Sequence, residues 1–382
     1  MNSAGAAEQK SMRLSVVVSV HNGGEGLRLC LQALAASARP PDEVIVVDDG
    51  STDGSAALAA ALAARVLTTS AGPRGPAHAR NRGAETATGE VLVFIDADVA
   101  VHADTLARME ALLAGEPDVA AVFGCYDDRP PARNPASLYK NLLHHYVHQH
   151  GAREAGTFWS GCGAVRRAVF RAASGFDEGY TRPSIEDIEL GVRLRQAGLR
   201  IRLCPEIQAT HLKRWTLASL WRTDIFGRAV PWTRLILRQG RLSTDLNLDW
   251  RSRLSALAAW ALLASILLLL AFGLLGLGRL VACGAGDLCS PRTIAGGNGN
   301  PPRVPISAIW PGLGVLLASA GVTVLNADLY RFFFRRGGAR FALIAAALHV
   351  AYLLYSSLVF ACVLVSHRLR GSVGRSREPT IK

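Results

Sequence analysis

The chain of 382 residues is half hydrophobic and carries a formal net charge of +12 at pH 7. Its length allows one large domain or two smaller ones with a substantial buried core. The basic residues concentrate beside apolar segments, and no DNA- or RNA-binding motif accompanies them. We therefore expect anionic lipid, and not nucleic acid, to be the partner of this charge.

Strands and helices alternate through the first 212 residues. Runs of β-branched residues predict buried strands at 14–20 and 43–47, and helices are predicted at 27–36 and 55–64. Turns rich in glycine, asparagine and aspartate separate them. This order is typical of an α/β domain with a parallel sheet, whose ligands bind at the carboxyl ends of the strands.

Two acidic turns come directly after predicted strands. Asp48 and Asp49 end one strand, and Asp96 and Asp98 end the next long apolar run. Because parallel strands end at the same edge of a sheet, we expect these four carboxylates to converge. Two carboxylates one residue apart form an oxygen-only site for a hard divalent cation. The first turn has the alternative of capping the helix after it, but the two turns together favour a binding site.

A basic helix is predicted between the two acidic turns. Pro76 opens it, and Arg74, Arg80 and Arg82 lie on it or beside it. Arginine at an acidic edge suits a diphosphate that is bridged by a metal ion. The alternative interpretation is an ordinary basic helix face.

Four segments in this order and spacing resemble the family 2 glycosyltransferases. They are Ser-Val-Val-Val-Ser-Val-His-Asn at 15–22, Val-Val-Asp-Asp-Gly-Ser-Thr-Asp-Gly-Ser at 46–55, Ala-Arg-Asn-Arg-Gly at 79–83 and Phe-Ile-Asp-Ala-Asp at 94–98. The resemblance implies a GT-A fold, which is a nucleotide-binding α/β sandwich. His21 stands where the family usually has tyrosine or another aromatic residue.

The same resemblance implies a donor site for a nucleotide sugar. Asp49 and Arg80 would contact the nucleoside, and Asp96 and Asp98 would serve the ribose, the diphosphate and a bound Mg²⁺ or Mn²⁺. The residues that we assign to the donor on this side are Asn22, Asp48, Asp49, Arg80 and Asp96.

The predicted acceptor half begins with a helix near 104–113, a strand near 119–124 and a helix at 135–150. The last helix carries His144 and His148, four residues apart, and this spacing also suits a metal-binding pair. Because the stretch has no acidic or cysteine companion, we interpret it as a partly exposed helix near the membrane or the acceptor.

A turn of small residues at 158–164 contains Trp159, Gly161 and Gly163. It is similar to the family segment whose backbone lines the donor-sugar pocket. Trp159 beside glycines is suited to stack on a sugar face, and the alternative is a tryptophan of the hydrophobic core.

The helix at 185–194 begins with Glu186 and Asp187, and Ile188, Val192 and Leu194 are predicted to form its buried face. The positive end of the helix dipole favours a charged carboxylate at its start. Inverting sugar transfer needs one base to take the proton of the acceptor hydroxyl. The Glu-Asp pair resembles the catalytic motif of the family, which makes Asp187 the base and Glu186 its neighbour. The alternative is a carboxylate that only stabilises the helix.

A strand is predicted at 201–204, and His211-Leu-Lys-Arg-Trp comes after it. This segment resembles the Gln-x-x-Arg-Trp motif of membrane-bound polysaccharide synthases, with histidine in place of glutamine. The resemblance implies that His211 is an additional metal ligand, that Arg214 contacts the leaving diphosphate and that Trp215 borders the acceptor.

Residues 213–250 mix basic and aromatic side chains, as helices that lie in a lipid headgroup layer do. Three apolar stretches without Asp, Glu, Lys or Arg come next, at 254–278, 304–327 and 341–366. Each is long enough to cross a hydrocarbon core of about 30 Å, which requires about 20 helical residues. We predict a membrane region at 251–366 and a basic tail at 367–382.

The orientation of the protein is predicted from its termini and its loops. Residues 1–12 are polar, lack the apolar core of a secretory signal and are expected to be disordered. Arg251 and Arg253 precede the first apolar stretch, and four arginines lie between the second and the third. Positive charge favours the cytoplasmic side. We therefore expect a multi-pass protein of the plasma (cell inner) membrane with a cytoplasmic catalytic domain, although three spans would put the basic tail outside.

Seven cysteines show close spacing only at Cys283 and Cys289, which could pair in a loop expected to lie outside. The cysteines of the soluble domain are predicted to be reduced and buried.

The sequence as a whole predicts an inverting, metal-dependent hexosyltransferase with a UDP- or GDP-linked donor and a lipid-linked or glycan acceptor. Two alternatives stay open, a processive polysaccharide synthase and a non-catalytic membrane scaffold that retains the fold.

Overall fold

The computed structural model describes residues 11–62, 64–69, 72–239, 250–284 and 306–375. The chain divides into two compact units, Met1–Asn247 with Val359–Lys382, and Leu248–Leu358. The predicted disorder of the first ten residues, part of the predicted interfacial stretch and the pairing of Cys289 fall outside the described residues. In the described part of the first unit, Cys30, Cys125, Cys162 and Cys204 are buried free thiols, as predicted.

A mixed sheet of eight strands forms the centre of the first unit. Its spatial order is β3-β2-β1-β4-β7-β6-β8-β5. The strands are β1 (Leu14–Val20), β2 (Glu43–Asp48), β3 (Arg65–Thr68), β4 (Val91–Asp96), β5 (Val99–Val101), β6 (Val119–Tyr126), β7 (Cys162–Arg166) and β8 (Arg200–His211).

The predicted parallel arrangement is confirmed for β1 to β4. It is wrong for β7, which runs antiparallel to β4 and β6, and for β5, which runs antiparallel to β8. The reason for β7 is that the chain enters it beside the carboxyl end of β4, where Cys162 pairs with Ile95, and then runs back along β4.

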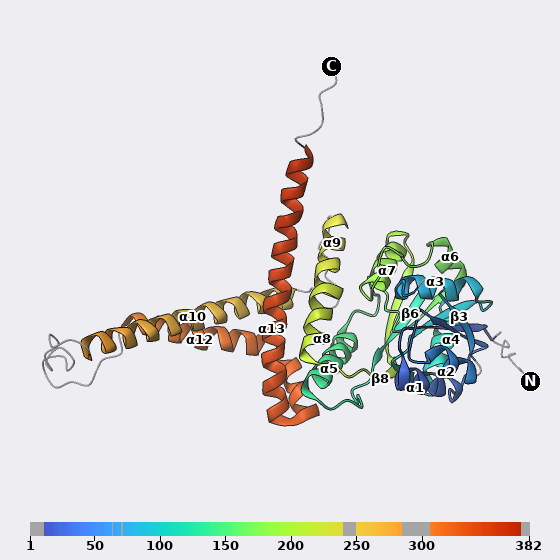
Figure 1. The fold of residues 1–382 in the computed structure, drawn as a ribbon, viewed down its shortest axis with the longest axis horizontal. Helices are drawn as coiled ribbons and strands as arrows, with labels where there is room; N and C mark the ends of the chain where they lie inside the picture. Colours follow the sequence, from blue (N-terminus) through green and yellow to red (C-terminus); the bar gives the residue numbers. More distant parts are fainter. Residues whose placement is uncertain (1–10, 63, 70–71, 240–249, 285–305, 376–382) are drawn as a thin grey trace, which may run out of the picture. The chain divides into compact units, whose positions relative to one another are not determined.

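Helices cover both faces of this sheet (Figure 1). One face packs against α1 (Gly24–Ala35), α2 (Ser55–Ala61) and α4 (Thr105–Gly115), and the other packs against α3 (Pro76–Thr86), α6 (Arg167–Ala172) and α7 (Glu186–Gln196). Successive strand residues serve opposite faces, because Val16 and Val18 join the first core and Val17 joins the second. The α/β prediction is confirmed.

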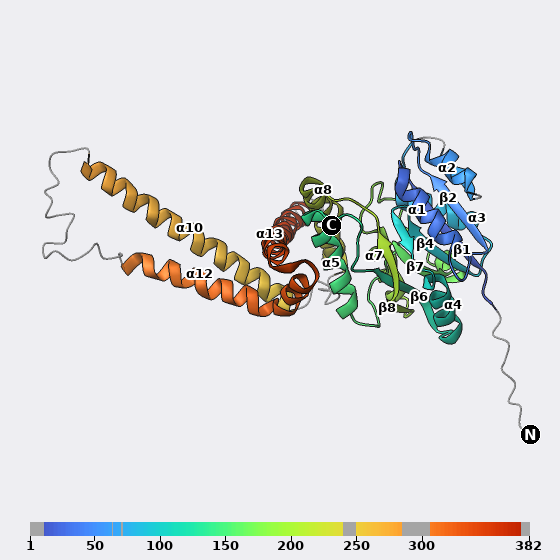
Figure 2. The same ribbon diagram turned by 90° about the horizontal axis from the view of Figure 1, so that it is seen from below.

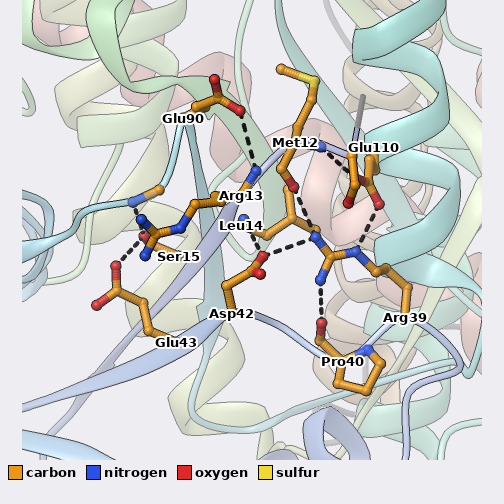
Figure 3. Close-up of polar contacts among 12 residues, drawn as sticks. Met12, Arg13, Leu14, Ser15, Arg39, Pro40, Asp42, Glu43, Glu90 and Glu110 are labelled. Atoms are coloured by element: carbon orange, nitrogen blue, oxygen red, sulfur yellow. Dashed lines mark hydrogen bonds and ion pairs between the residues drawn. The ribbon is translucent and has the colours of Figure 1, made fainter. Parts of the chain in front are cut away.

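Polar contacts fix the amino ends of β1 and β2, at the edge opposite the acidic turns. Arg39 donates to Glu110 at 2.8 Å, to Asp42 at 2.9 Å and to the Met12 carbonyl at 2.8 Å. Asp42 in turn accepts from the backbone N–H of Leu14 at 2.7 Å. Figure 3 shows how these groups surround the start of β1.

The remaining helices of the first unit come after β6 and β8. They are α5 (Pro135–His150), α8 (Leu217–Arg222), the π-helix η1 (Thr223–Ala229) and α9 (Val230–Gln239). β8 is much longer than the predicted strand at 201–204, so His211 is the last residue of a strand and not part of a loop.

The second unit contains α10 (Trp250–Gly284), α12 (Ile306–Leu325) and the greater part of α13 (Ala327–Arg375). Figure 2 shows α10 and α12 side by side, and the side chain of Asn326 next to α12 donates to Ser255 of α10 at 3.0 Å. Gly314 of α12 lies so close to α10 that a Cβ there would meet Ser265 Oγ at 2.5 Å.

Two of the described helical segments are long and apolar enough to cross a membrane, Trp250–Leu275 and Ala327–Leu369. The predicted span at 304–327 corresponds to α12, a helix of 20 residues whose described apolar stretch, Ile309–Leu325, is not one of these two segments. The predicted span at 341–366 lies within α13, after the non-helical Gly338. The count of three spans is therefore not confirmed.

Candidate functional site

The acidic turns meet at the carboxyl edge of the parallel strands. Val20 of β1 pairs in register with Asp48, and Ser19 pairs with Asp96 of β4. Asp48 and Asp49 are buried, whereas Asp96 is partly exposed. The structure thus brings together two turns that are far apart in the sequence.

Asp49 holds the loop that precedes α3. Its carboxylate accepts from Thr69 Oγ1 at 3.0 Å, from the N–H of Arg74 at 2.9 and 3.0 Å, and from the N–H of Gly75 at 2.7 Å. A carboxylate offers about four lone-pair positions. The loop occupies them, so the geometry gives Asp49 a loop-holding role that the sequence did not indicate.

Asn22 links the first two turns. Its backbone is left-handed, with φ of 54°, a conformation that asparagine tolerates better than most residues. Its Oδ1 accepts from the N–H of Thr52 at 2.8 Å, and its N–H donates to Ser51 Oγ at 2.8 Å. The neighbouring His21 donates from Nδ1–H to the carbonyl of Asp49 at 2.9 Å.

Arg80 is the buried cation of the site. From α3 it donates to Asp96 of β4 at 2.7 Å and to Glu186 of α7 at 2.7 Å, and it lies 5.7 Å from the ring centre of Phe176. Burial lowers the pKa of Arg80, but the charges of Asp96 and Glu186 outweigh it and raise the pKa above its usual value. Three elements are therefore joined through one guanidinium.

Glu186 is almost fully buried at the start of α7. Burial raises the pKa of Glu186, and the neighbouring Arg80 only partly offsets this effect. One of its oxygens binds Arg80, and the other accepts from the N–H of Ser184 at 3.0 Å. Both oxygens thus have partners within the protein.

Asp187, the predicted base, is fixed beside the turn at 158–161. Its Oδ2 accepts from the backbone N–H of Ser160 at 3.0 Å and from Ser160 Oγ at 3.1 Å. The next residue, Gly161, accepts from the N–H of Asp96 at 3.2 Å. The turn therefore ties the predicted base to the metal end of β4.

Asp98 lies 3.8 Å from His211 Nε2 and 3.9 Å from Lys213 Nζ. Burial opposes ionisation of Asp98, but the contact with His211 and the charge of Lys213 lower its pKa below the usual value. The backbone of the two segments is also joined, because the Leu212 N–H donates to the Asp98 carbonyl at 2.8 Å. His211 and Asp98 are thus neighbours.

The Asp98–His211 pair fits a divalent cation. Among the described residues no three His, Cys, Asp or Glu side chains are grouped to hold a metal ion. Two coordination bonds of about 2.1 Å span up to about 4.2 Å, which accommodates the 3.8 Å between these two ligand atoms. The other positions would remain for diphosphate oxygens and water. Asp96, the other predicted metal ligand, directs Oδ1 to Arg80.

The predicted sugar pocket is more closely packed than expected. Trp159 meets the ring of Tyr126 edge-on at 4.8 Å and also contacts His144 at 4.7 Å, which favours the core interpretation. A Cβ at Gly161 would lie 2.6 Å from the Trp159 ring, and one at Gly163 would lie 2.3 Å from the Trp159 carbonyl. These glycines permit that packing.

The histidines of α5 mainly satisfy the backbone of β6. His145 Nδ1–H donates to the carbonyl of Tyr126 at 2.7 Å and His148 Nδ1–H to that of Gly124 at 3.1 Å. Both side chains are buried, so the expectation of a partly exposed helix is wrong for this face. The hydrogen bond of His148 argues against the metal-pair alternative.

The end of the His211–Trp215 motif divides into a buried and an exposed part. Trp215 is buried, with its N–H bonded to Ser137 at 2.7 Å and with Lys213 over its ring at 4.6 Å. Arg214 is exposed. The structure therefore gives Trp215 a packing role and leaves Arg214 accessible.

The buried face of α7 differs from the prediction. Leu190, Gly191 and Leu194 are buried, whereas Ile188 and Val192 are only partly so. The reason is a close approach, because a Cβ at Gly191 would lie 2.1 Å from the backbone nitrogen of Phe158. The helix turns its glycine side to the 158–161 turn and so directs Asp187 to Ser160.

Sequence reasoning missed the partners of the site residues. Ser160, Phe176 and Tyr126 contact Asp187, Arg80 and His211, respectively. The small-residue turn was the one signal that pointed toward Ser160. The other two partners depend on distant strands and loops.

The fold has a counterpart among solved structures. It is similar to the mannosyltransferase PcManGT from Pyrobaculum calidifontis, whose structure is a complex with GDP-Man and Mn²⁺. The TM-score is 0.53 at 20% identity, and the match covers 88% of this chain and 86% of that chain. This likeness concerns the fold alone, and it confirms the predicted GT-A type of α/β domain.

Residues 15–173 match the family model described as "Glycosyl transferase family 2", which confirms the resemblance for this segment. The pre-mycofactocin glycosyltransferase of Mycobacterium tuberculosis is 31% identical over 265 residues, 66% of this chain and 52% of that protein. The validoxylamine A glucosyltransferase of Streptomyces hygroscopicus subsp. limoneus is 29% identical over 236 residues, 52% of each chain. The chain spans about half the length of these curated relatives.

The pairing of the buried Arg80 guanidinium predicts that Arg80→Met lowers the unfolding free energy much more than Arg82→Met does. Replacing Arg80 by Met would leave Glu186 buried without its partner and cost about 3–5 kcal/mol of unfolding free energy. Arg82→Met on the same helix removes only the exposed pair with Glu85 and should cost at most about 1 kcal/mol. Urea denaturation of the detergent-solubilised chain, monitored by tryptophan fluorescence, measures both. The double variant Arg80→Met/Glu186→Gln should recover part of the loss, and equal costs for the two single variants would contradict the assignment.

Proposed function

We propose that this chain is a membrane-bound family 2 glycosyltransferase. It transfers one hexose, with inversion, from a UDP- or GDP-linked donor to a lipid-linked or glycan acceptor at the membrane. The observation that carries the proposal is the joint placement of Asp98 with His211, and of Asp187 with Ser160, around the Arg80 bridge. The match of residues 15–173 to the family supports it.

The donor half would use the carboxyl edge of β1, β2 and β4. The proposed donor site would be bordered at this edge by Asn22, Asp48 and the loop held by Asp49, which are joined by hydrogen bonds to their neighbouring turns. Arg80 keeps Asp96 oriented at the end of β4. Asp98 and His211 would hold Mg²⁺ or Mn²⁺, which supplies positive charge to the departing diphosphate. The exposed Arg214 is placed to add a further cation.

Asp187 is the proposed base. Inversion by one displacement requires a single carboxylate to accept the proton of the attacking hydroxyl. The two hydrogen bonds from Ser160 hold Asp187 Oδ2 in place, and Asp187 itself is only partly buried. Glu186 is less suited to this role, because it is almost fully buried and bonded to the cation Arg80, whereas Asp187, whose Oδ1 accepts from the Ile188 N–H, is partly exposed.

The α8–η1 stripe, defined as Leu217, Trp221 and Phe226, is the proposed contact with lipid headgroups. These apolar side chains are 47%, 43% and 71% exposed. Leu217 and Trp221 are four residues apart in an α-helix, and Phe226 comes five residues later across a π-helix, whose i to i+5 repeat keeps it on the same face. Exposed basic residues accompany the stripe, namely Lys213, Arg214, Arg222, Arg228, Arg234 and Arg238.

This combination supports a membrane location. Aromatic and basic side chains together favour the boundary between headgroups and acyl chains. The chain continues into Trp250–Leu275, one of the two candidate spans in the described residues. We propose that the protein is a multi-pass protein of the plasma membrane with its catalytic domain on the cytoplasmic side.

Donor binding tests the proposal most directly. UDP- and GDP-hexoses should raise the unfolding temperature of the detergent-solubilised chain, because a ligand at 100 times its Kd stabilises the folded state by about 2.7 kcal/mol. This increase should require Mn²⁺. Asp98→Asn should lose the Mn²⁺-dependent shift, whereas Glu85→Gln, on the exposed side of α3, should retain it. If none of the donors shifts the unfolding temperature, the scaffold alternative is favoured. If the shift is equally large without Mn²⁺, the proposed metal dependence is wrong.

The base assignment predicts a loss of rate without a loss of donor binding. Asp187→Asn should lower kcat by about 10²–10⁴, because the hydroxyl proton has no acceptor, and should leave the Mn²⁺-dependent thermal shift unchanged. Nucleotide release in the presence of membrane lipid extract measures the rate. Asp177→Asn, which changes a carboxylate bonded to the Gly179 N–H, is the control. Equal rates for Asp187→Asn and wild type would falsify the assignment, and a ladder of long products would favour the processive synthase.

The α8–η1 stripe predicts contact with lipid. A fluorophore attached to Phe226→Cys, in a chain whose Cys283, Cys289 and Cys362 are serine, should be quenched by spin-labelled lipid in nanodiscs. The same fluorophore on Glu85→Cys, in the exposed pair on α3, should be quenched at least several-fold less. The physical reason is that transfer of the apolar stripe from water into lipid lowers the free energy. Equal quenching at the two positions would show that the stripe does not enter the lipid.

A further inference from the structure

The imidazole of His211 lies flat against the ring of Tyr126. Their centroids are 4.1 Å apart and their planes differ by 4°. Tyr126 ends β6 and His211 ends β8, and Tyr126 pairs in register with Ala209 in this parallel pair of strands. His211, two residues after Ala209, lies on the same face of the sheet as Ala209. The pairing of the strands therefore places the two rings together.

Tyr126 is itself held from several sides. The side chain is 7% exposed. Its carbonyl accepts from His145 Nδ1–H at 2.7 Å, while Trp159 meets its ring edge-on at 4.8 Å and His144 contacts it at 4.4 Å. Tyr126 is a fixed surface for a neighbouring ring.

Among the described residues, the contact of His211 with Asp98 is too long to orient its ring by a hydrogen bond. Histidine ligands usually donate their second ring nitrogen to a carboxylate or a carbonyl, which sets the direction of the ligating nitrogen. Within the described part of the chain, Nε2 of His211 lies 3.8 Å from Asp98 Oδ2, which is longer than a hydrogen bond. The side chain is nevertheless 6% exposed, so its surroundings are protein and not bulk water. Of the two described aromatic rings that contact His211, Tyr126 is stacked on it at 4.1 Å, whereas Trp215 lies tilted at 6.4 Å, so the Tyr126 ring is the contact that defines its plane.

We propose that Tyr126 is a positioning residue, whose ring fixes the plane of His211 and thereby directs Nε2 toward the metal position at Asp98. The proposal rests on the proposed role of Asp98 and His211 in holding the cation. In this chain a stacked phenol does what a hydrogen bond to the other ring nitrogen does at most histidine ligands. The aromatic ring matters for this role and the hydroxyl does not.

The chain contains a matched control. Tyr146 and His150 on α5 form a second stacked pair with the same centroid distance of 4.1 Å, and there the carbonyl of Tyr146 also accepts from His150 Nδ1–H at 2.8 Å. This pair is not part of the candidate site. Tyr146→Leu therefore removes a tyrosine of the same kind, from the same type of contact, without affecting His211.

Mn²⁺ binding to the detergent-solubilised full chain tests the proposal, with free Mn²⁺ measured by electron paramagnetic resonance. Tyr126→Leu should weaken Mn²⁺ binding about ten- to a hundredfold, as the loss of a residue that orients a metal ligand does. Tyr126→Phe and Tyr146→Leu should bind Mn²⁺ as the wild type does. Unchanged binding by Tyr126→Leu, together with weakened binding by His211→Ala, would overturn the positioning role alone. Unchanged binding by His211→Ala would overturn the proposed metal role as well.

A spectroscopic measurement keeps the proposal testable if Tyr126→Leu does not fold. In the chain labelled at histidine, the ring protons of His211 should appear upfield of the usual range, because they lie over the Tyr126 ring, and His211→Ala identifies the signal. The upfield shift should persist in Tyr126→Phe. A His211 signal at the ordinary position in the wild type would show that the rings are not stacked and would overturn the proposal.

Discussion

The rest of the site depends on the burial of one guanidinium. A buried charge is tolerated only when it is paired, and Arg80 is paired twice, with Asp96 of β4 and with Glu186 of α7. Asp187 comes directly after Glu186, so the bridge that anchors the donor side also sets the position of the proposed base. Arg80 therefore couples β4 and α7. Neither element can move away from Arg80 without leaving a charge unpaired or exposing it to water.

The charges around this bridge explain why a cation suits the site. Four carboxylates lie at or beside it, those of Asp96, Asp98, Glu186 and Asp187, against the cations Arg80 and Lys213. A diphosphate that approached such an edge would be repelled, because like charges in partly buried surroundings are weakly screened. A divalent cation held by Asp98 would reverse the sign of the local field. The acidic edge and the basic helix α3 are thus complementary parts of one arrangement.

Local patterns in the sequence were enough to predict one part of the site and not another. The convergence of Asp48 and Asp96 was predictable because each ends a β-branched run, and parallel strands end at one edge. The role of Asp49 was not, because its acceptor positions are taken by the N–H groups of Arg74 and Gly75. That arrangement depends on the backbone of the loop, where Gly75 has φ of 102° and comes so close to Thr181 that a Cβ would meet its carbonyl carbon at 2.6 Å. A contact between segments so distant in the chain has no signature in either of them.

The histidines also show that local sequence patterns do not reveal contacts between distant segments. The spacing of His144 and His148 suits a metal pair, but β6 shifts register against β8 between Phe123 and Cys125. Gly124 lies at this irregularity and Tyr126 ends the strand, and buried carbonyls need donors. His145 and His148 provide them, so imidazoles that resemble ligands in the sequence complete the hydrogen bonding of a strand. His211, a single histidine in sequence, ends β8, pairs in register with Val99 of β5 and lies beside the Tyr126 ring. The position of a histidine relative to the sheet, and not the number of histidines nearby, separates the proposed ligand His211 from the two histidines that donate to β6.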